Sequence, residues 1–177
     1  MKRRMIFTLT LVLILTSGIF AQNRFAVGII GSRFGNTKED SKLTDIKNPA
    51  GYGIVASYAI SEELSVAFTG EYFKDDLESN LGNERDLRSH VSLFLSPFSS
   101  TEPRPYVSAG IVYTNRKIEY SDNSVETKGL VNARFGIGAD YHLIQNLFVN
   151  LDLGIYNNGM NVVGWSSSVG LRYGINL

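Results

Sequence analysis

The stretch from Val131 to Tyr141, VNARFGIGADY, decides the fold of this chain. Apolar or aromatic side chains occupy every second position, and Asn132, Arg134 and Asp140 share the alternate positions with two glycines. Successive side chains of a strand point to opposite faces of a sheet, so a period of two predicts a β-strand with one apolar and one polar face. The same pattern recurs at residues 64–72, 147–156 and 165–177.

Continued along the chain, this alternation predicts eight strands, most of which reach the 9–11 residues that a tilted strand needs to cross a bilayer. We expect them at residues 24–32, 51–60, 64–73, 88–97, 105–115, 129–142, 147–156 and 163–176. Short turns at 61–63, 98–104 and 144–146 alternate with longer polar segments at 33–50, 74–87, 116–128 and 157–162. Short turns on one rim and long loops on the other are typical of outer-membrane barrels. The sequence therefore predicts an all-β fold, an eight-stranded antiparallel up-and-down transmembrane β-barrel.

The first 21 residues have the order of a signal peptide. Lys2, Arg3 and Arg4 precede an apolar run from Met5 to about Phe20, and Ala21 follows. We expect residues 1–21 to be removed and residues 22–177 to form the barrel domain. Without those three cations, 14 of the 17 basic residues remain against 17 acidic ones, a net charge of about −3 that suggests no nucleic-acid partner. The chain has no Cys, which excludes disulfides and thiolate metal sites, and we expect no metal and no cofactor.

The aromatic residues of the apolar faces sort into two belts around an aliphatic band. The outer belt comprises Tyr52, Tyr72, Tyr113, Phe135 and Trp165, and the periplasmic belt comprises Phe25, Tyr58, Tyr141 and Tyr173. Aromatic side chains gather at the two interfaces of a bilayer, so the belts favour an apolar face that points outward into lipid. A soluble, lipocalin-like periplasmic binding barrel, with the apolar face inward, is the alternative.

The strand set and the last strand, which ends VGLRYGINL, resemble the small outer-membrane barrels of the OmpA/OmpX type, a porin-like outer membrane protein β-barrel domain. The resemblance implies the outer membrane of a Gram-negative bacterium as the location and membrane lipids and lipopolysaccharide as contacts. In that family the terminal strand usually ends in an aromatic residue, whereas here Leu177 is last and Tyr173 is the nearest aromatic. We expect a monomer.

Charged side chains on the polar faces are predicted to point into the lumen. They are Glu71, His90, Arg134, Asp140, Asp152 and Arg172. Eight strands leave an interior that side chains just fill, and buried charges need partners, so we expect a paired polar network. A narrow channel or a carrier of small solutes through the lumen is the alternative interpretation.

For function, the sequence favours a non-enzymatic surface or envelope protein whose loops, 33–50 and the acidic 74–87, stabilise the envelope or contact an extracellular protein partner. A second alternative is a lipid A-modifying hydrolase, because His90-Val91-Ser92 resembles the His-x-Ser pair of the lipid A deacylase barrels. Such an enzyme needs this pair on the lipid-facing wall, whereas Val91 takes that side here. The segment SHVSLF also lacks the Asn that follows Ser in that family. We therefore predict no catalytic residues.

Overall fold

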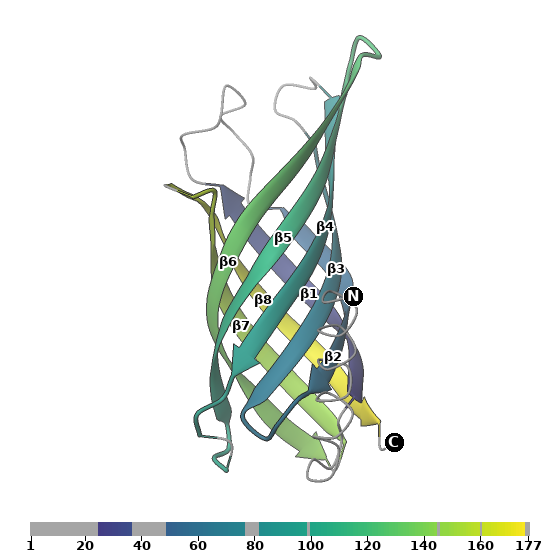
Figure 1. Ribbon diagram of the computed structural model, residues 1–177. Helices are drawn as coiled ribbons and strands as arrows, with labels where there is room; N and C mark the ends of the chain where they lie inside the picture. The colour runs from purple at the N-terminus through teal and green to yellow at the C-terminus, as the bar shows by residue number, and fades with distance from the viewer. Residues whose placement is uncertain are drawn as a thin grey trace, which may run out of the picture.

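The computed structural model describes residues 25–36, 49–76, 82–98, 100–144, 146–159 and 161–175, and the predicted signal peptide lies outside these ranges. The strands are β1 (Phe25–Asn36), β2 (Ala50–Ala59), β3 (Leu64–Asp76), β4 (Gly82–Leu95), β5 (Arg104–Tyr120), β6 (Val125–Ile144), β7 (Leu147–Asn157) and β8 (Val162–Ile175). Each pairs antiparallel with the next and β8 pairs with β1, so the barrel closes (Figure 1). The predicted fold class is confirmed. Within the described ranges, no helix is long and apolar enough to cross a bilayer.

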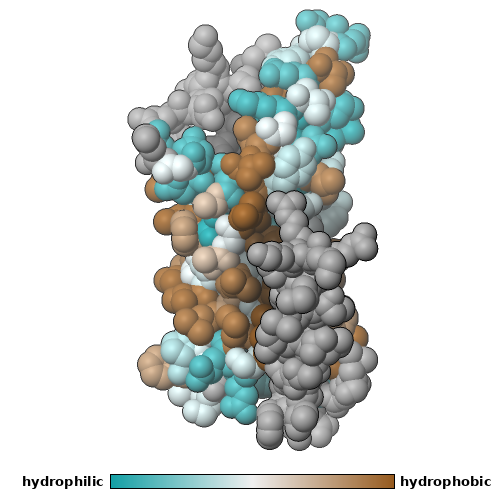
Figure 2. Space-filling model, viewed as in Figure 1, coloured by the Kyte–Doolittle hydropathy of each residue, from teal (hydrophilic) through white to brown (hydrophobic). Residues whose placement is uncertain are grey.

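The two faces of the wall differ as the alternation predicts. Outward side chains of the middle of the wall are apolar and exposed, among them Ile54 at 70% and Ile29 at 65%. Figure 2 shows hydrophobic residues as a brown region in the middle of the visible face, with hydrophilic residues above and below. A wall that exposes aliphatic side chains and buries polar ones suits lipid outside the barrel and a polar interior.

Strand pairing keeps the apolar faces of neighbouring strands on the same side. Tyr52 lies opposite Tyr72 across β2 and β3, and their rings are 5.8 Å apart. The turn between these strands is closed by the backbone N–H of Ile60, which donates to the Leu64 carbonyl over 2.8 Å. A slip of one residue would move every apolar side chain of a strand into the lumen, so this turn and the pattern specify the same register.

The upper ends of the strands differ from the prediction. A loop was expected over residues 116–128, but β5 continues to Tyr120 and β6 begins at Val125 (Figure 1). Likewise, β3 and β4 take up most of the expected loop 74–87, and only residues 77–81 lie outside the described part. Of the expected loop 33–50, residues 37–48 lie outside it. The prediction was wrong because it located strands by their apolar residues, whereas most side chains at these strand ends are polar.

The β5–β6 hairpin therefore rises beyond the other strands. Its tip is a tight turn in which the Tyr120 backbone N–H donates to the Ser124 carbonyl over 2.9 Å. Asn123 there has φ +66°, a left-handed conformation that Asn tolerates better than most residues. The pairing of β6 with β7 begins only at Ala133 opposite Asn157. In the described part of the chain, residues 125–132 of β6 thus pair with β5 alone.

Candidate functional site

All six charged residues predicted for the lumen point inward, and the structure brings them together in three pairs. His90 Nε2 lies 2.8 Å from Glu71 Oε2 in the upper half of the barrel. The other two pairs are Arg134 with Asp152 and Arg172 with Asp140. Each of the two Arg–Asp pairs joins opposite charges, which offsets part of the cost of removing these groups from water.

In the lower half, two neutral residues that the sequence analysis missed link the pairs. The Tyr106 hydroxyl donates to Asp152 Oδ2 over 3.0 Å. The Asn150 amide nitrogen donates to the Tyr106 oxygen and to Asp140 Oδ1, each over 2.8 Å. Tyr106 and Asn150 are both buried, at 3% and 8% exposure. These bonds join β5, β6 and β7 into one network and hold the carboxylates in place.

In the upper half, the missed residue is Arg88, which is only 2% exposed. Its guanidinium carbon lies 3.5 Å from the centre of the Phe34 ring and 4.5 Å from that of Phe73. Its Nη2 donates to Asp86 Oδ2 over 2.9 Å. A cation over aromatic faces is stabilised by their quadrupoles, most strongly where water is excluded. Arg88 therefore joins β1, β3 and β4 across the upper lumen.

Above Arg88, the inward face continues as a ladder of charges. Arg116 Nε lies 2.8 Å from Glu84 Oε1 and 3.0 Å from Asp86 Oδ1. Glu84 and Asp86 are 5% and 3% exposed, within the segment expected to be a solvated acidic loop. One signal for them was present: Glu84, Asp86, Arg88 and His90 stand at every second position, as lumen-facing residues of a strand must.

One small cavity lies within the lumen. The cavity around His90, Ser92, Arg134 and Asp152 measures about 40 Å³. A cavity needs roughly 10–15 Å³ of such volume for one water, so a few waters at most would fit. Among the described residues, no group of three or more His, Asp or Glu side chains could hold a metal ion.

The pair that resembled a hydrolase motif does not face lipid. His90 and Ser92 are 7% and 5% exposed and line the lumen, while Val91 between them is 47% exposed on the outer wall. A lipid-cleaving pair must reach a bond in a membrane lipid. The geometry therefore offers these two residues no substrate in the bilayer.

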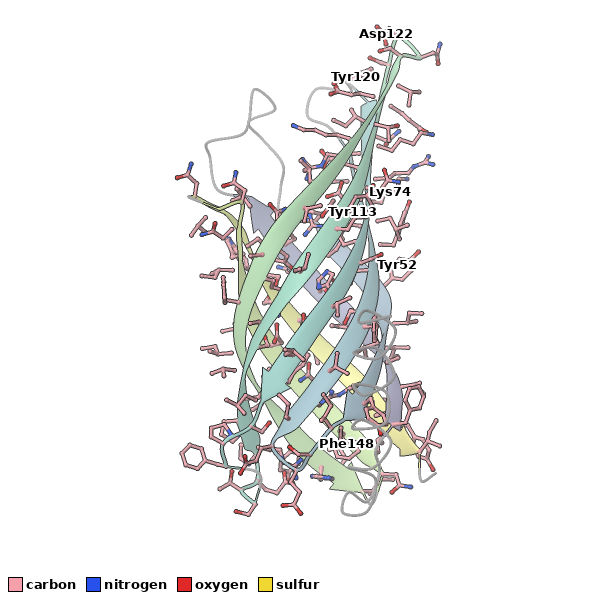
Figure 3. The ribbon with its side chains drawn as sticks, viewed as in Figure 1. Tyr52, Lys74, Tyr113, Tyr120, Asp122 and Phe148 are labelled. Carbon is pink, nitrogen blue, oxygen red and sulfur yellow. The ribbon has the colours of Figure 1, made fainter. Side chains whose placement is uncertain are left out.

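The outward-facing aromatic residues lie at two levels of the wall. In Figure 3, Tyr52 and Tyr113 lie in the upper half of the barrel. Exposed members of the predicted belts are Tyr52, Tyr113, Phe135 and Trp165 above, and Tyr141 and Tyr173 below. Phe25, Tyr58 and Tyr72 are half-buried.

The hairpin carries a second set of polar contacts, exposed to solvent. Glu119 accepts from Lys117 Nζ over 2.7 Å and lies 3.2 Å from Arg85 Nη2. The Lys117 hydrogen bond and the Arg85 charge lower the pKa of Glu119 below its ordinary value. The Tyr120 hydroxyl donates to Glu126 Oε2 over 3.1 Å, which raises the pKa of Tyr120. The Tyr120–Glu126 bond joins β5 to β6, and the Arg85–Glu119 pair joins β4 to β5, but these exposed contacts bury no charge.

Comparisons with known proteins agree with this geometry. The family model described as "Outer membrane protein beta-barrel domain" matches residues 7–174. Among solved structures, Neisserial surface protein A is 15% identical, with a TM-score of 0.68, over 85% of this chain and 97% of that one. OprG of Pseudomonas aeruginosa is also 15% identical, with a TM-score of 0.67, over 91% and 99%. Ail of Yersinia pestis is 14% identical, with a TM-score of 0.58, over 88% and 99%. Such identities show the fold alone, and no curated protein matches.

Proposed function

The chain belongs to the outer membrane protein β-barrel domain family and lies in the outer membrane of a Gram-negative bacterium, and on this basis we propose that it is a non-enzymatic surface protein whose β5–β6 hairpin contacts a partner outside the cell. The location excludes the soluble periplasmic binding barrel that the alternation alone left open. Membrane lipids surround its wall.

The observation that carries the proposal is the length of the hairpin. β6 has 20 residues and β5 has 17, whereas a tilted strand crosses a bilayer in about 9–11. Several residues of each strand must therefore stand above the membrane (Figure 1). Paired strands resist bending, so the hairpin presents its tip well away from the lipid surface.

The free edge of β6 suggests how a partner could bind. Residues 125–132 direct part of their backbone N–H and C=O groups away from β5, and in the described part of the chain β7 does not reach them. Such an edge can take up an extended segment of another protein as an additional strand. Val125, at 56% exposure, adds apolar surface beside this edge.

Both enzymatic and conducting functions are less favoured. His90 and Ser92 face away from lipid, and the Arg88 guanidinium packs against the Phe34 and Phe73 rings inside the upper lumen. A folded protein that conducts no ions in planar bilayers would agree with this interpretation. Steady single-channel conductance would instead favour the channel.

The decisive experiment shortens the hairpin. Replacing residues 118–126 with an Asn-Gly turn joins Lys117 to Thr127, which already lie opposite each other, and keeps Arg116 on its carboxylates. We expect cells with the shortened protein to lose adhesion to one another and to immobilised proteins. Their resistance to detergent should not change.

A matched variant separates the edge from the tip. Val125→Lys keeps the full hairpin and places a lysine on the free edge, opposite Glu119, where it hinders strand addition. We expect it to weaken adhesion less than the shortening does. A gel shift between unheated and heated samples verifies that each variant folds. Adhesion equal to that of the unmodified protein in both variants would refute the proposal.

A further inference from the structure

We propose that the outer wall of β1, β2 and β3 holds one phosphate-bearing lipid of the outer leaflet, with an acyl chain in a hollow beside Gly31 and Gly70 and the phosphate between Arg33 and Lys74. The inference uses the location in the outer membrane but is independent of the hairpin and its partner. Each can therefore fail without the other.

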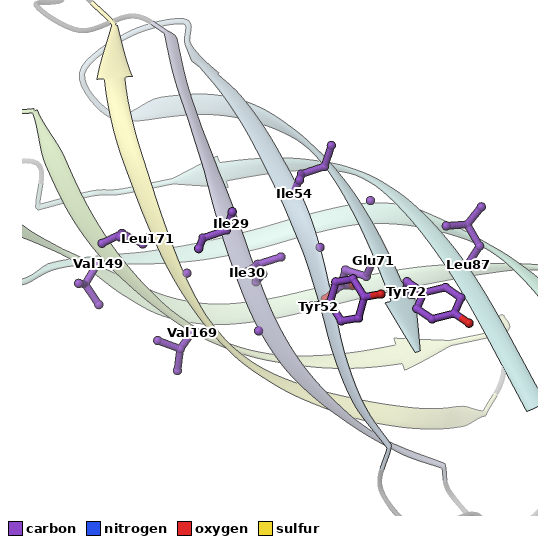
Figure 4. A pocket seen from close by; sticks show the side chains of 14 residues that line it. Ile29, Ile30, Tyr52, Ile54, Glu71, Tyr72, Leu87, Val149, Val169 and Leu171 are labelled. Atoms are coloured by element: carbon purple, nitrogen blue, oxygen red, sulfur yellow. The ribbon is translucent and has the colours of Figure 1, made fainter. Parts of the chain in front are cut away.

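The hollow lies on the lipid-facing wall, across β8, β1, β2 and β3 (Figure 4). Its lining is almost wholly apolar and includes Ile29, Ile54, Val169 and Leu171. Tyr52 and Tyr72 border it, and their rings lie 5.8 Å apart. A depression of this kind in a wall that otherwise bears large aliphatic side chains can receive a flexible hydrocarbon chain.

Gly31 and Gly70 create the hollow, and packing within the barrel does not require glycine at either position. A Cβ added at Gly70 would meet no atom within 4 Å, and one at Gly31 would only reach the Val169 carbonyl oxygen at 4.0 Å. Gly53, by contrast, faces the lumen, where a Cβ would come 2.1 Å from the Gly70 carbonyl oxygen. Glycine weakens a strand and often marks a site where a ligand approaches the backbone.

Two cations stand above the hollow. Arg33 follows Gly31 by two residues on β1, and Lys74 follows Gly70 by four residues on β3. Arg33 lies opposite Ala50, and Gly51 lies opposite Phe73, so Ala50 is the small residue between the two cations. Because β2 lies between them, β1 and β3 are about 9.6 Å apart. At this separation the long side chains of Arg33 and Lys74 can both reach one phosphate.

The charges around this position are not balanced. Lys74 lies directly opposite Arg85, and like charges in such a pair destabilise a sheet. Glu119 pairs with both Arg85 and Lys117, so one negative charge faces two positive charges, whereas Arg33 and Lys74 form no ion pair with any described residue. A bound phosphate would offset this repulsion.

The vertical order of these groups matches a lipid rather than a free anion. Figure 3 places Lys74 above both Tyr113 and Tyr52, which mark the level of the headgroups. Gly70 lies four residues further down β3, about 13 Å along the strand, on the hydrocarbon side. From the outer rim toward the middle of the wall, the cations come first, then the aromatic rings, then the apolar hollow. A lipid presents its groups in the same order: the phosphate, then the glycerol or sugar, then the acyl chain.

The test is native mass spectrometry of the folded protein, extracted from the outer membrane into detergent and titrated with purified lipid A. Gly70→Leu fills the hollow, and Ala109→Leu adds the same side chain to an exposed position of β5 as the control. Arg33→Gln combined with Lys74→Gln removes the cations, and Lys128→Gln is the control. We expect both test variants to bind at least fivefold more weakly and both controls to bind like the unmodified protein.

Two further titrations distinguish a lipid phosphate from a free phosphate ion. Dephosphorylated lipid A should bind more weakly than lipid A, and inorganic phosphate should not displace it. Displacement by inorganic phosphate would mean a free-anion site and would overturn the proposal. Equal binding by the test variants and their controls would overturn it as well. If Gly70→Leu shows no heat-dependent gel shift, Gly31→Leu fills the same hollow from β1 and takes its place.

Discussion

Two ion pairs of the same chemical kind lie in contrasting parts of this barrel. Arg134 and Asp152 face each other in the lumen with side chains 7% and 6% exposed, whereas Arg85 on β4 meets Glu119 on the hairpin with side chains 44% and 29% exposed. The lumen pair is desolvated, whereas the exposed pair remains hydrated. The comparison teaches that position, not pairing, decides how much the fold depends on a charge.

The surroundings of the two pairs explain the difference. In the lumen, Tyr106 donates to Asp152, and Arg134 Nη1 donates to Ser108 Oγ over 3.2 Å. On the hairpin, Lys117 shares Glu119 with Arg85, so the carboxylate keeps one cation if it loses the other. Removing one member of the lumen pair therefore leaves the other charge buried without a partner. Removing one member of the exposed pair leaves the other group in contact with water.

The largest effect is expected from Arg134→Met, which leaves Asp152 buried without its cation. Breaking a buried pair from one side typically costs about 3–5 kcal/mol, so the urea midpoint in lipid vesicles should fall steeply. Replacing both members, Arg134→Met with Asp152→Leu, should recover much of the loss. A double variant as unstable as the single one would show that the pair itself, rather than the stranded charge, stabilises the barrel.

Arg88→Met should have an intermediate effect. Methionine can occupy the space between Phe34 and Phe73, and Asp86 keeps Arg116, so no carboxylate is left alone. The loss is the interaction of the cation with the rings, about 2 kcal/mol in a desolvated site. The same urea titration measures it. A loss as large as that of Arg134→Met would mean that Asp86 depends on Arg88 more than on Arg116.

Glu119→Gln should leave the urea midpoint of unfolding almost unchanged. Its partners are exposed, and such pairs contribute little to stability and are screened by salt. The urea midpoint should match that of the unmodified protein at both low and high salt. A clear loss at low salt would mean that the hairpin is coupled to the unfolding of the whole barrel.

The smallest effect concerns Asp122 at the hairpin tip, and it depends on pH. The Ser124 hydroxyl and backbone N–H donate to its carboxylate, and these hydrogen bonds lower the pKa of Asp122 below its ordinary value of 3.8. Because the folded pKa is the lower one, the stabilisation is present above pH 3.8 and disappears as the pH falls through the folded pKa. The Ser124 amide shift, followed by NMR, should move in that range. Asp122→Asn should abolish the movement.

How far the sequence could predict the fold is clearest in β4. The strand was expected from residue 88 but begins at Gly82, because the inward-facing Glu84 and Asp86 carry no hydrophobic signal. They are nonetheless held in a strand by pairing with β3 on one side and β5 on the other. The period of two was present in these residues, so attention to polar alternation would have extended the strand.

The sequence could predict which side chains point into the lumen but not which of them contact one another. Alternation places Glu71 and His90 on the inward face, and their strands are neighbours. The contact of Arg88 on β4 with Phe34 on β1 joins strands that are not neighbours, and no local pattern relates them. Likewise, the hollow beside Gly70 exists only because Gly31 and Tyr52 arrive on adjacent strands.

By itself, the sequence determined the strands, the polar and apolar sides of each, and a closed wall that could lie in a membrane, because these follow from a period that every strand carries locally. Only the tertiary structure decided which charges meet across the lumen, how far the β5–β6 hairpin rises, and where the outer wall is hollow. Those features depend on how eight strands stagger when the barrel closes, and the stagger is a property of all the strands together.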